Sequence, residues 1–166
     1  MASTTFSGPV TSTNGFIGNV TGAVTATTPV NATASTLTVT AATHGGRVVT
    51  LNRAAGIAVT LPAASGSGTV YEFVIGTSVT SNSTTIKVAN ASDTMTGPAY
   101  VISDGAAAVL GYKTGASDDT VTFNGTTTGG LKGDTVRLVD IAANLYSVQV
   151  LSQATGTEAT PFSATV

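Results

Sequence analysis

The sequence predicts an all-β fold, an antiparallel β-sandwich or barrel that follows an extended N-terminal arm. Residues 36–151 contain short runs rich in valine, isoleucine and threonine, with turn residues at roughly the 8–12-residue spacing of sandwiches and barrels. No stretch shows a sustained helical period, and threonine and valine disfavour helices. We therefore expect an arm (1–35), a β domain (36–151) and a C-terminal tail (152–166).

The expected strands follow one another along the β domain. They are RVVTLN (47–52), IAVTL (57–61), TVYEFVIG (69–76), STTIKVAN (83–90), AYVIS (99–103), AAAVLGYK (106–113), DTVTFN (119–124), DTVRLVDI (134–141) and NLYSVQVL (144–151). In IAVTL, the alternation places Ile57, Val59 and Leu61 on one face. Asp104-Gly105 predicts a two-residue hairpin turn. We expect a jelly-roll or β-tulip-like arrangement, although alternation does not say which strands pair.

The arm differs in composition from the β domain. Residues 1–35 carry no charged side chain, and their large apolar side chains are Phe6, Phe16 and Ile17. Such a segment cannot bury enough apolar area to fold alone. The expected anchor is strand addition to the sheet of a neighbouring subunit, with these three side chains in its pockets. Addition to the chain's own sheet is the alternative. The tail has a similar character, with Phe162 as its large anchor.

The charge content is low. Charged residues are 8% of the chain, against about 25% in an average soluble domain, and the net charge is −2. The basic residues are scattered singly, whereas nucleic-acid binding needs a clustered positive field. The apolar runs are also shorter than the roughly 20 residues of a membrane-spanning helix. Because interface cores are depleted in lysine, glutamate and aspartate, this composition indicates an oligomer.

Catalytic and ligand-binding motifs are not recognisable in this sequence. Cysteine is absent, and the single histidine, His44, lies in the turn ATHGGR, where we expect an exposed or capping role. The adjacent Asp118 and Asp119 lack the spacing of a calcium loop and are expected to bond nearby backbone N–H groups. We therefore expect no enzyme activity and no catalytic, cofactor or metal site.

Two further patterns resemble sites only in part. Asp134, Arg137 and Asp140 share one expected strand, but in a regular strand Arg137 points away from both carboxylates. A partner for any of them must therefore come from a neighbouring strand. The sequence GGLKGD (129–134) does not have the Gly-Lys-Ser/Thr order of a phosphate-binding loop.

Several stretches resemble virion structural proteins of tailed bacteriophages. They are TTFSGPVTSTNGF, GRVVTLNRAAGIAVTLPAASGSGTVYEFVIGTSVTSNSTTIKVANASDTMTG, DDTVTFNGTTTGGLKGDTVRLVDIAANLYSVQVL and the ending GTEATPFSATV. The resemblance covers nearly the whole chain. Within that group, a small all-β protein with an N-terminal arm is most similar to the head decoration, or cement, proteins.

This resemblance implies a structural role on the outside of a mature capsid. The protein would be made in the host cytoplasm and located in the virion, commonly as a homotrimer at local threefold positions. Its partners would be the major capsid protein and neighbouring decoration subunits, with no nucleic acid or membrane. The expected interface residues are Phe6, Phe16, Ile17 and Phe162.

The alternative is a head-fibre or tail-fibre protein that binds the host surface. Fibre proteins usually contain long repetitive shafts, and no shaft-like repeat is visible. Aromatic residues are 5% of the chain and tryptophan is absent, which is unfavourable for a carbohydrate-binding surface. A surface-layer or adhesin fragment is a third possibility, but it requires a secretory signal, which the start of the sequence does not resemble.

Overall fold

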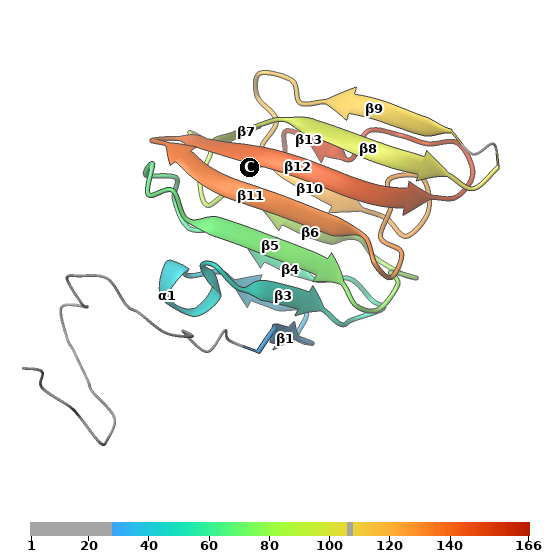
Figure 1. Cartoon of the computed structure of the whole chain (residues 1–166), viewed down its shortest axis with the longest axis horizontal. Coiled ribbons are helices and arrows are strands. Elements are labelled where there is room, and N and C mark those ends of the chain that lie inside the picture. Colours follow the sequence, from blue (N-terminus) through green and yellow to red (C-terminus); the bar gives the residue numbers. More distant parts are fainter. Residues whose placement is uncertain (1–27, 106–107) are drawn as a thin grey trace, which may run out of the picture.

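The computed structural model describes residues 28–105 and 108–166, and strands dominate this part of the chain (Figure 1). The larger of two sheets contains, in order across it, β1 (Val30–Ala32), β3 (Val48–Leu51), β5 (Val70–Ile75), β11 (Thr135–Ala142), β12 (Leu145–Ala154), β8 (Pro98–Ser103) and β9 (Val109–Lys113), with β7 (Thr94–Thr96) also paired to β12. The smaller sheet contains β13 (Phe162–Ser163), β10 (Thr120–Phe123), β6 (Thr84–Lys87), β4 (Ala58–Thr60) and β2 (Thr36–Thr38). A short helix, α1 (Ala41–His44), follows β2. The expectation of an all-β fold is confirmed.

Both sheets are mixed, so the expectation of antiparallel sheets is wrong for the first six strands. β1, β3 and β5 run parallel in the larger sheet, and β2, β4 and β6 run parallel in the smaller one. The chain therefore crosses to the other sheet after every strand, and each pair of strands makes one coil of a short stack. We call residues 30–87 the coil region. Because jelly rolls are antiparallel, their pairing does not describe this region.

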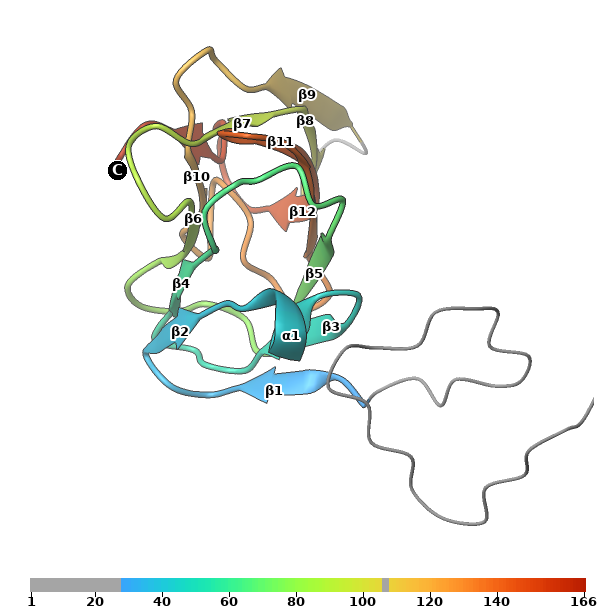
Figure 2. The ribbon, with the colours of Figure 1, turned by 90° about the vertical axis from the view of Figure 1, so that its left-hand side faces the viewer.

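The second half of the larger sheet is built from hairpins. β8 and β9 are antiparallel neighbours, and so are β11 and β12, while β12 runs parallel to β8. We call these four strands the hairpin region. In the smaller sheet β10 lies antiparallel to both β6 and β13. Figure 2 shows the two sheets facing each other, with β1 and β2 at one end of the molecule and β9 at the other.

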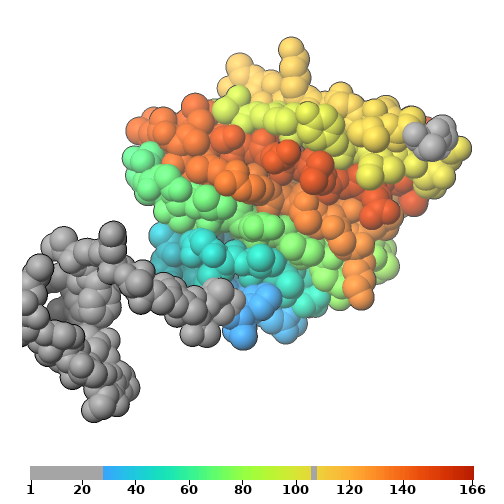
Figure 3. Space-filling view, in the orientation of Figure 1, coloured from blue at the N-terminus to red at the C-terminus, as the bar shows by residue number. Residues whose placement is uncertain are grey.

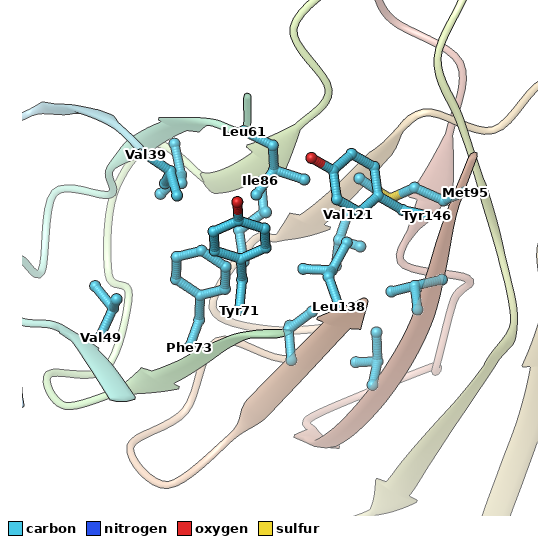
Figure 4. Close-up of a cluster of buried hydrophobic side chains, with 14 of the residues drawn as sticks. Val39, Val49, Leu61, Tyr71, Phe73, Ile86, Met95, Val121, Leu138 and Tyr146 are labelled. Carbon is cyan, nitrogen blue, oxygen red and sulfur yellow. The ribbon is translucent and has the colours of Figure 1, made fainter. Parts of the chain in front are cut away.

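The hydrophobic core lies between the two sheets (Figure 4). Tyr71, Phe73 and Leu138 come from the larger sheet, and Ile86 and Val121 come from the smaller one; all five are at most 1% exposed. Burial of each large side chain stabilises the fold by about 1.5–3 kcal/mol. The core therefore joins the coil region to the later strands.

Two aromatic side chains near the centre of the core are further fixed by directional contacts. The rings of Tyr71 and Tyr146 meet edge to face, with their centroids 6.4 Å apart (Figure 4). The Tyr146 hydroxyl donates a hydrogen bond to the carbonyl of Pro62 at 2.8 Å. A phenol that is buried to this degree needs such an acceptor, because an unpaired hydroxyl is costly away from water.

The alternation of single strands is confirmed, and one turn is longer than expected. Ile57, Val59 and Leu61 are all buried on one face, as IAVTL predicts. β8 and β9 do form a hairpin, but the Ser103 N–H donates to the Ala108 carbonyl at 3.0 Å. The connection therefore spans more than the two residues Asp104-Gly105.

The described ends of the chain are paired into the sheets. β1, in the segment expected to be arm, pairs with β3, and β13, in the segment expected to be tail, pairs with β10. Arg47 holds the start of this part, since its guanidinium donates to the carbonyl of Thr28 at 2.6 Å and to that of Thr43 at 3.0 Å. In residues 28–105 and 108–166, no helix has the length and apolar character to cross a membrane.

Candidate interaction surface

The strands β8, β9 and β12 run side by side on the outer face of the larger sheet (Figure 3). Large apolar side chains are exposed on this face. We define the apolar patch as Tyr100, Ile102, Val109 and Leu151. Their exposed fractions lie between 43% and 60%. Leu151 pairs with Tyr100, and Ile102 pairs with Val109, so the four side chains are close neighbours. A cluster of large exposed apolar side chains is typical of an interaction site.

Strand alternation explains why these side chains face the solvent. Ala99 and Val101 of β8 are completely buried, so Tyr100 and Ile102 must point outward. Leu151 has the same position on β12, between two buried residues. A strand with one solvated face usually alternates apolar with polar residues. β8 instead carries apolar side chains on both faces, which marks its outer face as unusual.

The apolar patch surrounds a hollow of about 310 Å³. Its wall is completed by four further residues, Gly133, Asp134, Ser152 and Gln153. The hollow therefore combines apolar side chains with a few polar groups. Its size is at the lower end of the roughly 300–1,000 Å³ seen in ligand and peptide pockets.

A smaller, polar hollow of about 150 Å³ adjoins the apolar patch through Leu151. Glu72 and Arg137 line it, and they are directly opposite each other on β5 and β11. Arg137 is exposed, whereas Asp140 of the same strand and Asp134, which directly precedes the strand, are both buried. This confirms that Arg137 points away from them. On the outer face of the larger sheet, the apolar patch is therefore flanked on one side by the oppositely charged residues Glu72 and Arg137.

Half of the acidic side chains of the protein are removed from its surface. The chain has eight Asp and Glu residues, and four of them are at most 5% exposed: Asp93, Asp119, Asp134 and Asp140. Each accepts hydrogen bonds from backbone N–H groups. The surface available to a partner is therefore even poorer in negative charge than the composition indicates.

Asp140 fixes the loop between the two sheets at Ser65, Gly66 and Ser67. Its carboxylate accepts bonds from the three backbone N–H groups at 2.7–3.0 Å and from both serine hydroxyls. Gly66 has φ of +77°, a conformation that other residues adopt with strain. Burial alone raises the pKa of Asp140, but these hydrogen bonds outweigh it and lower the pKa to about 2.

Asp134 braces the wall of the apolar hollow. It accepts from the N–H groups of Gly130 and Leu131 at 2.8 and 3.0 Å, and from that of Gln153 on β12 at 3.0 Å. Here burial is the larger influence and raises the pKa of the carboxyl, although the three backbone donors act in the opposite direction. Asp134 and Asp140 therefore have similar roles but opposite pKa shifts.

Of the adjacent pair Asp118 and Asp119, Asp118 has the expected turn chemistry, whereas the backbone donors to Asp119 come from the far end of the chain. Asp118 accepts from the Gly115 N–H at 2.7 Å. Asp119 accepts from the N–H groups of Thr165 and Val166 at 2.9 and 3.2 Å, and so holds the end of the chain. Burial raises the pKa of Asp119, but its hydrogen bonds and the nearby charge of Lys87 lower it overall.

His44 is the last residue of the short helix α1, whose N-cap is Thr40 and whose C-cap is Gly45. The hydroxyl of Thr40 accepts a hydrogen bond from the Thr43 N–H, and the Nδ1 atom of His44 accepts one from the Thr40 N–H at 3.0 Å. His44 therefore supports the N-cap residue without being the cap itself. The imidazole is 6% exposed, so it is buried rather than exposed.

The expected interface residues are not part of the apolar patch. Phe6, Phe16 and Ile17 lie outside the described residues. Phe162 is 6% exposed and fills the chain's own core, so we leave it out of the candidate surface. Sequence reasoning did not single out the apolar patch. The signal was the run AYVIS, which is apolar at both alternating positions.

A metal centre is not indicated in the described part of the chain, where no three His, Asp or Glu side chains are grouped to hold an ion. In comparisons with protein-family models, with curated proteins and with solved structures, nothing matches this chain.

Proposed function

We propose that this protein is a non-enzymatic structural protein of a tailed-phage virion, which decorates and stabilises the outside of the mature capsid. It acts as a homotrimer that contacts the major capsid protein and neighbouring decoration subunits. In this proposal the facing sheets form a β-sandwich, and the N-terminal segment contacts a neighbour. The observation that carries the proposal is the apolar patch on the larger sheet.

The apolar patch fits a lattice contact for two physical reasons. First, burial of apolar surface provides about 25 cal/mol per Å² without requiring charged partners. Second, the charged residue that lines the hollow, Asp134, is buried and already accepts hydrogen bonds from three backbone N–H groups, so a partner need not desolvate it. Interfaces of this kind have a core that is depleted in charge and a more polar rim. The adjoining polar hollow, with Glu72 and Arg137, has the character of such a rim.

Capsid stabilisation follows from binding alone. A protein that binds the mature lattice but not its precursor stabilises the mature form by its binding free energy, at every site it occupies. Each contact can be of ordinary size, on the order of 1,000–2,000 Å², because many copies act together. No catalytic group is needed for this role.

The first test is the copy number of the chain in purified virions, measured by quantitative mass spectrometry against the major capsid protein. A ratio near one to one supports a lattice-wide cement. A few dozen copies or fewer contradicts it and favours the alternative, a head-fibre or tail-fibre protein that binds the host. Absence from the particle rules out both functions.

The second test locates the contact. Leu151→Glu places a charge in the apolar patch, and we expect it to weaken binding to capsids stripped of this protein by at least about tenfold, the equivalent of roughly 1.4 kcal/mol. Thr38→Glu is the matched control, because it places the same charge at an exposed strand position of the smaller sheet, away from the apolar patch and from the polar hollow. Equal binding by the two variants would remove the apolar patch from the interface.

A further inference from the structure

The strand β9 is the last strand of the larger sheet, at the end of the molecule away from β1 (Figure 1, Figure 2). It contains five residues, whereas the other edge strands, β1, β2 and β13, contain three, three and two. Proteins usually prevent edge pairing by short strands, by proline or by charge. Pro29 and Pro161 precede β1 and β13, but β9 has no proline and one charged residue, Lys113, at its end. Among the described strands, β9 is therefore the longest edge and has little protection.

Two hydrogen bonds fix which backbone groups of β9 face β8. Beyond one end of β9, the Ser103 N–H donates to the Ala108 carbonyl at 3.0 Å. Beyond its other end, the Thr114 N–H donates to the Gly97 carbonyl at 3.1 Å. Hydrogen-bonded and non-hydrogen-bonded pairs alternate along an antiparallel ladder, so every second residue between these two bonds also faces β8.

The remaining residues of β9 direct their backbone outward. By this alternation Leu110 and Tyr112 bond to β8, and the N–H and C=O groups of Val109, Gly111 and Lys113 point away from it. Within residues 28–105 and 108–166, no backbone or side-chain group outside the sheet forms a hydrogen bond to these three residues. Such a row of unpaired groups is a template for a further strand.

The inner side chains of β9 are also incompletely covered. Leu110 pairs with Val101, and Tyr112 pairs with Ala99. Both β8 residues are completely buried, whereas Leu110 and Tyr112 are only partly buried. Each of these two side chains has a strand neighbour on one side only in the described sheet. A further strand would therefore cover apolar surface as well as satisfy backbone groups.

We propose that β9 pairs antiparallel with β9 of a second copy of the chain, around a twofold axis at Gly111. In this register Gly111 meets Gly111 of the second copy, and Val109 meets its Lys113. All outward backbone groups of both strands are then paired. On the inner face, Leu110 lies opposite Tyr112 of the second copy, an aliphatic–aromatic pair of the kind that stabilises sheets.

Backbone pairing and charge both select this register. Moving the axis by one residue in either direction leaves one of the three outward residues of each copy without a partner in β9. An axis at Lys113 would place two ammonium groups opposite each other, which is unfavourable. With the axis at Gly111, each Lys113 lies opposite a valine, and its long aliphatic stem can cover that side chain.

The pairing joins two copies of the larger sheet into one continuous sheet. The twofold axis between antiparallel strands is perpendicular to the sheet, so the apolar patches of both copies lie on the same side. This inference goes beyond the proposed function and does not rest on it. Where the chain also forms the proposed trimer, β9 joins subunits of neighbouring trimers, because an isologous contact closes on two copies.

Disulfide trapping tests the position of the axis. Gly111→Cys introduces the only thiol of the chain, and a Cβ atom at this position has no neighbour within 4 Å. The Cα atoms of a hydrogen-bonded antiparallel pair lie about 5.5 Å apart, within the range of a disulfide. We expect disulfide-linked dimers of the full chain to form at least about tenfold faster than with Lys113→Cys. This control is exposed on the same face of β9 but lies off the axis. Equal rates, or no dimers from either variant, overturn the proposal.

A charge comparison tests the register independently. Val109→Lys places like charges opposite each other in the pair with Lys113, whereas Val109→Glu places opposite charges there. We expect the dissociation constant of self-association, measured by sedimentation, to be about tenfold higher for Val109→Lys. Net charge alone favours the reverse order, because the native chain carries −2 and a further glutamate increases repulsion.

Equal dissociation constants, or tighter association of Val109→Lys, would contradict the pairing of Val109 with Lys113. A native chain that shows no self-association through β9 would contradict the interface itself. Both measurements use the free protein in solution and no capsid. Failure of this inference is therefore distinguishable from failure of the proposed function.

Discussion

The coil region and the hairpin region bury similar side chains but differ in what they present to solvent. In the coil region the outward residues of the strands are mainly small or polar, as in Ala58-Val59-Thr60, where the central valine is buried. The exposed large hydrophobic residues of the described chain all lie in β8 or beyond. The coil region therefore serves mainly to build the core, whereas the hairpin region also exposes the apolar patch.

The largest expected effect comes from a core truncation in the coil region, which tests whether this region builds the core. Phe73 of β5 is 1% exposed and packs between the two sheets. We expect Phe73→Ala to lower the free energy of unfolding by about 3–5 kcal/mol, through lost burial and a residual cavity. Denaturant unfolding checks this value. A loss below about 1 kcal/mol would show that the coil region contributes little to the core.

The second test removes the contact between the hairpin region and a loop of the coil region. Asp140 on β11 fixes the loop 65–67 of the coil region, and Asp140→Asn takes away the charged acceptor of five hydrogen bonds. We expect a loss of about 2–3 kcal/mol at pH 7, measured by denaturant unfolding. Ser67→Ala, which removes one donor of the same cluster, is the milder control and should lose less.

The pH dependence of this loss has a defined sign. The folded pKa of Asp140 is about 2, below the ordinary value of 3.8, so its ionised form stabilises the fold above pH 3.8. This contribution disappears as the pH falls from about 4 to 2. The difference in stability between the native chain and Asp140→Asn should therefore shrink over that range. A constant difference would mean that the charge of Asp140 is unimportant.

Asp134 should behave in the opposite way. Its folded pKa is raised, so its contribution to stability increases as the pH falls from neutrality through its folded pKa. We expect Asp134→Asn to lower stability at pH 7 by less than Asp140→Asn does. The free energy of unfolding of the native chain should therefore rise relative to that of Asp134→Asn as the pH falls through that range. Unfolding curves of both variants over the same pH series would show whether burial distinguishes the two carboxylates.

The smallest expected effect is at the apolar patch. Leu151 is 50% exposed, so Leu151→Ala should change the free energy of unfolding by no more than about 0.5 kcal/mol. The matched core substitution Val150→Ala, at the adjacent and completely buried position, should be clearly more destabilising. If both lose the same stability, the apolar patch is part of the core and the distinction between the regions is lost.

The sequence predicted the faces of single strands well because side-chain alternation is a local property. Ile57 and Val59 are on the face assigned to them, and so is Leu61. Whether neighbouring strands run parallel or antiparallel is not a local property. The same side-chain alternation occurs in strands joined by a parallel crossover and in strands joined by an antiparallel hairpin. The pairing of Val59 with Leu37 and with Ile86, each a full coil away along the chain, leaves no trace in a short window of sequence.

The candidate surface was harder to predict for a related reason. Tyr100 and Leu151 are far apart in the sequence and become neighbours only because β12 runs parallel to β8. A long apolar run such as AYVIS fits a strand buried on both faces equally well. The expected interface residue Phe162 was read from its isolated position in a polar tail, yet pairing of β13 with β10 brings it into the core.

The hold of Asp119 on the last two amides fixes where the chain leaves the molecule. β13 is at the edge of the smaller sheet opposite β2, so Val166 lies far from the end of the molecule formed by β1 and β2. A peptide or folded domain joined after Val166 would project from the end opposite those two strands. The fold would thus serve as a display scaffold that holds a fused cargo at one defined pole.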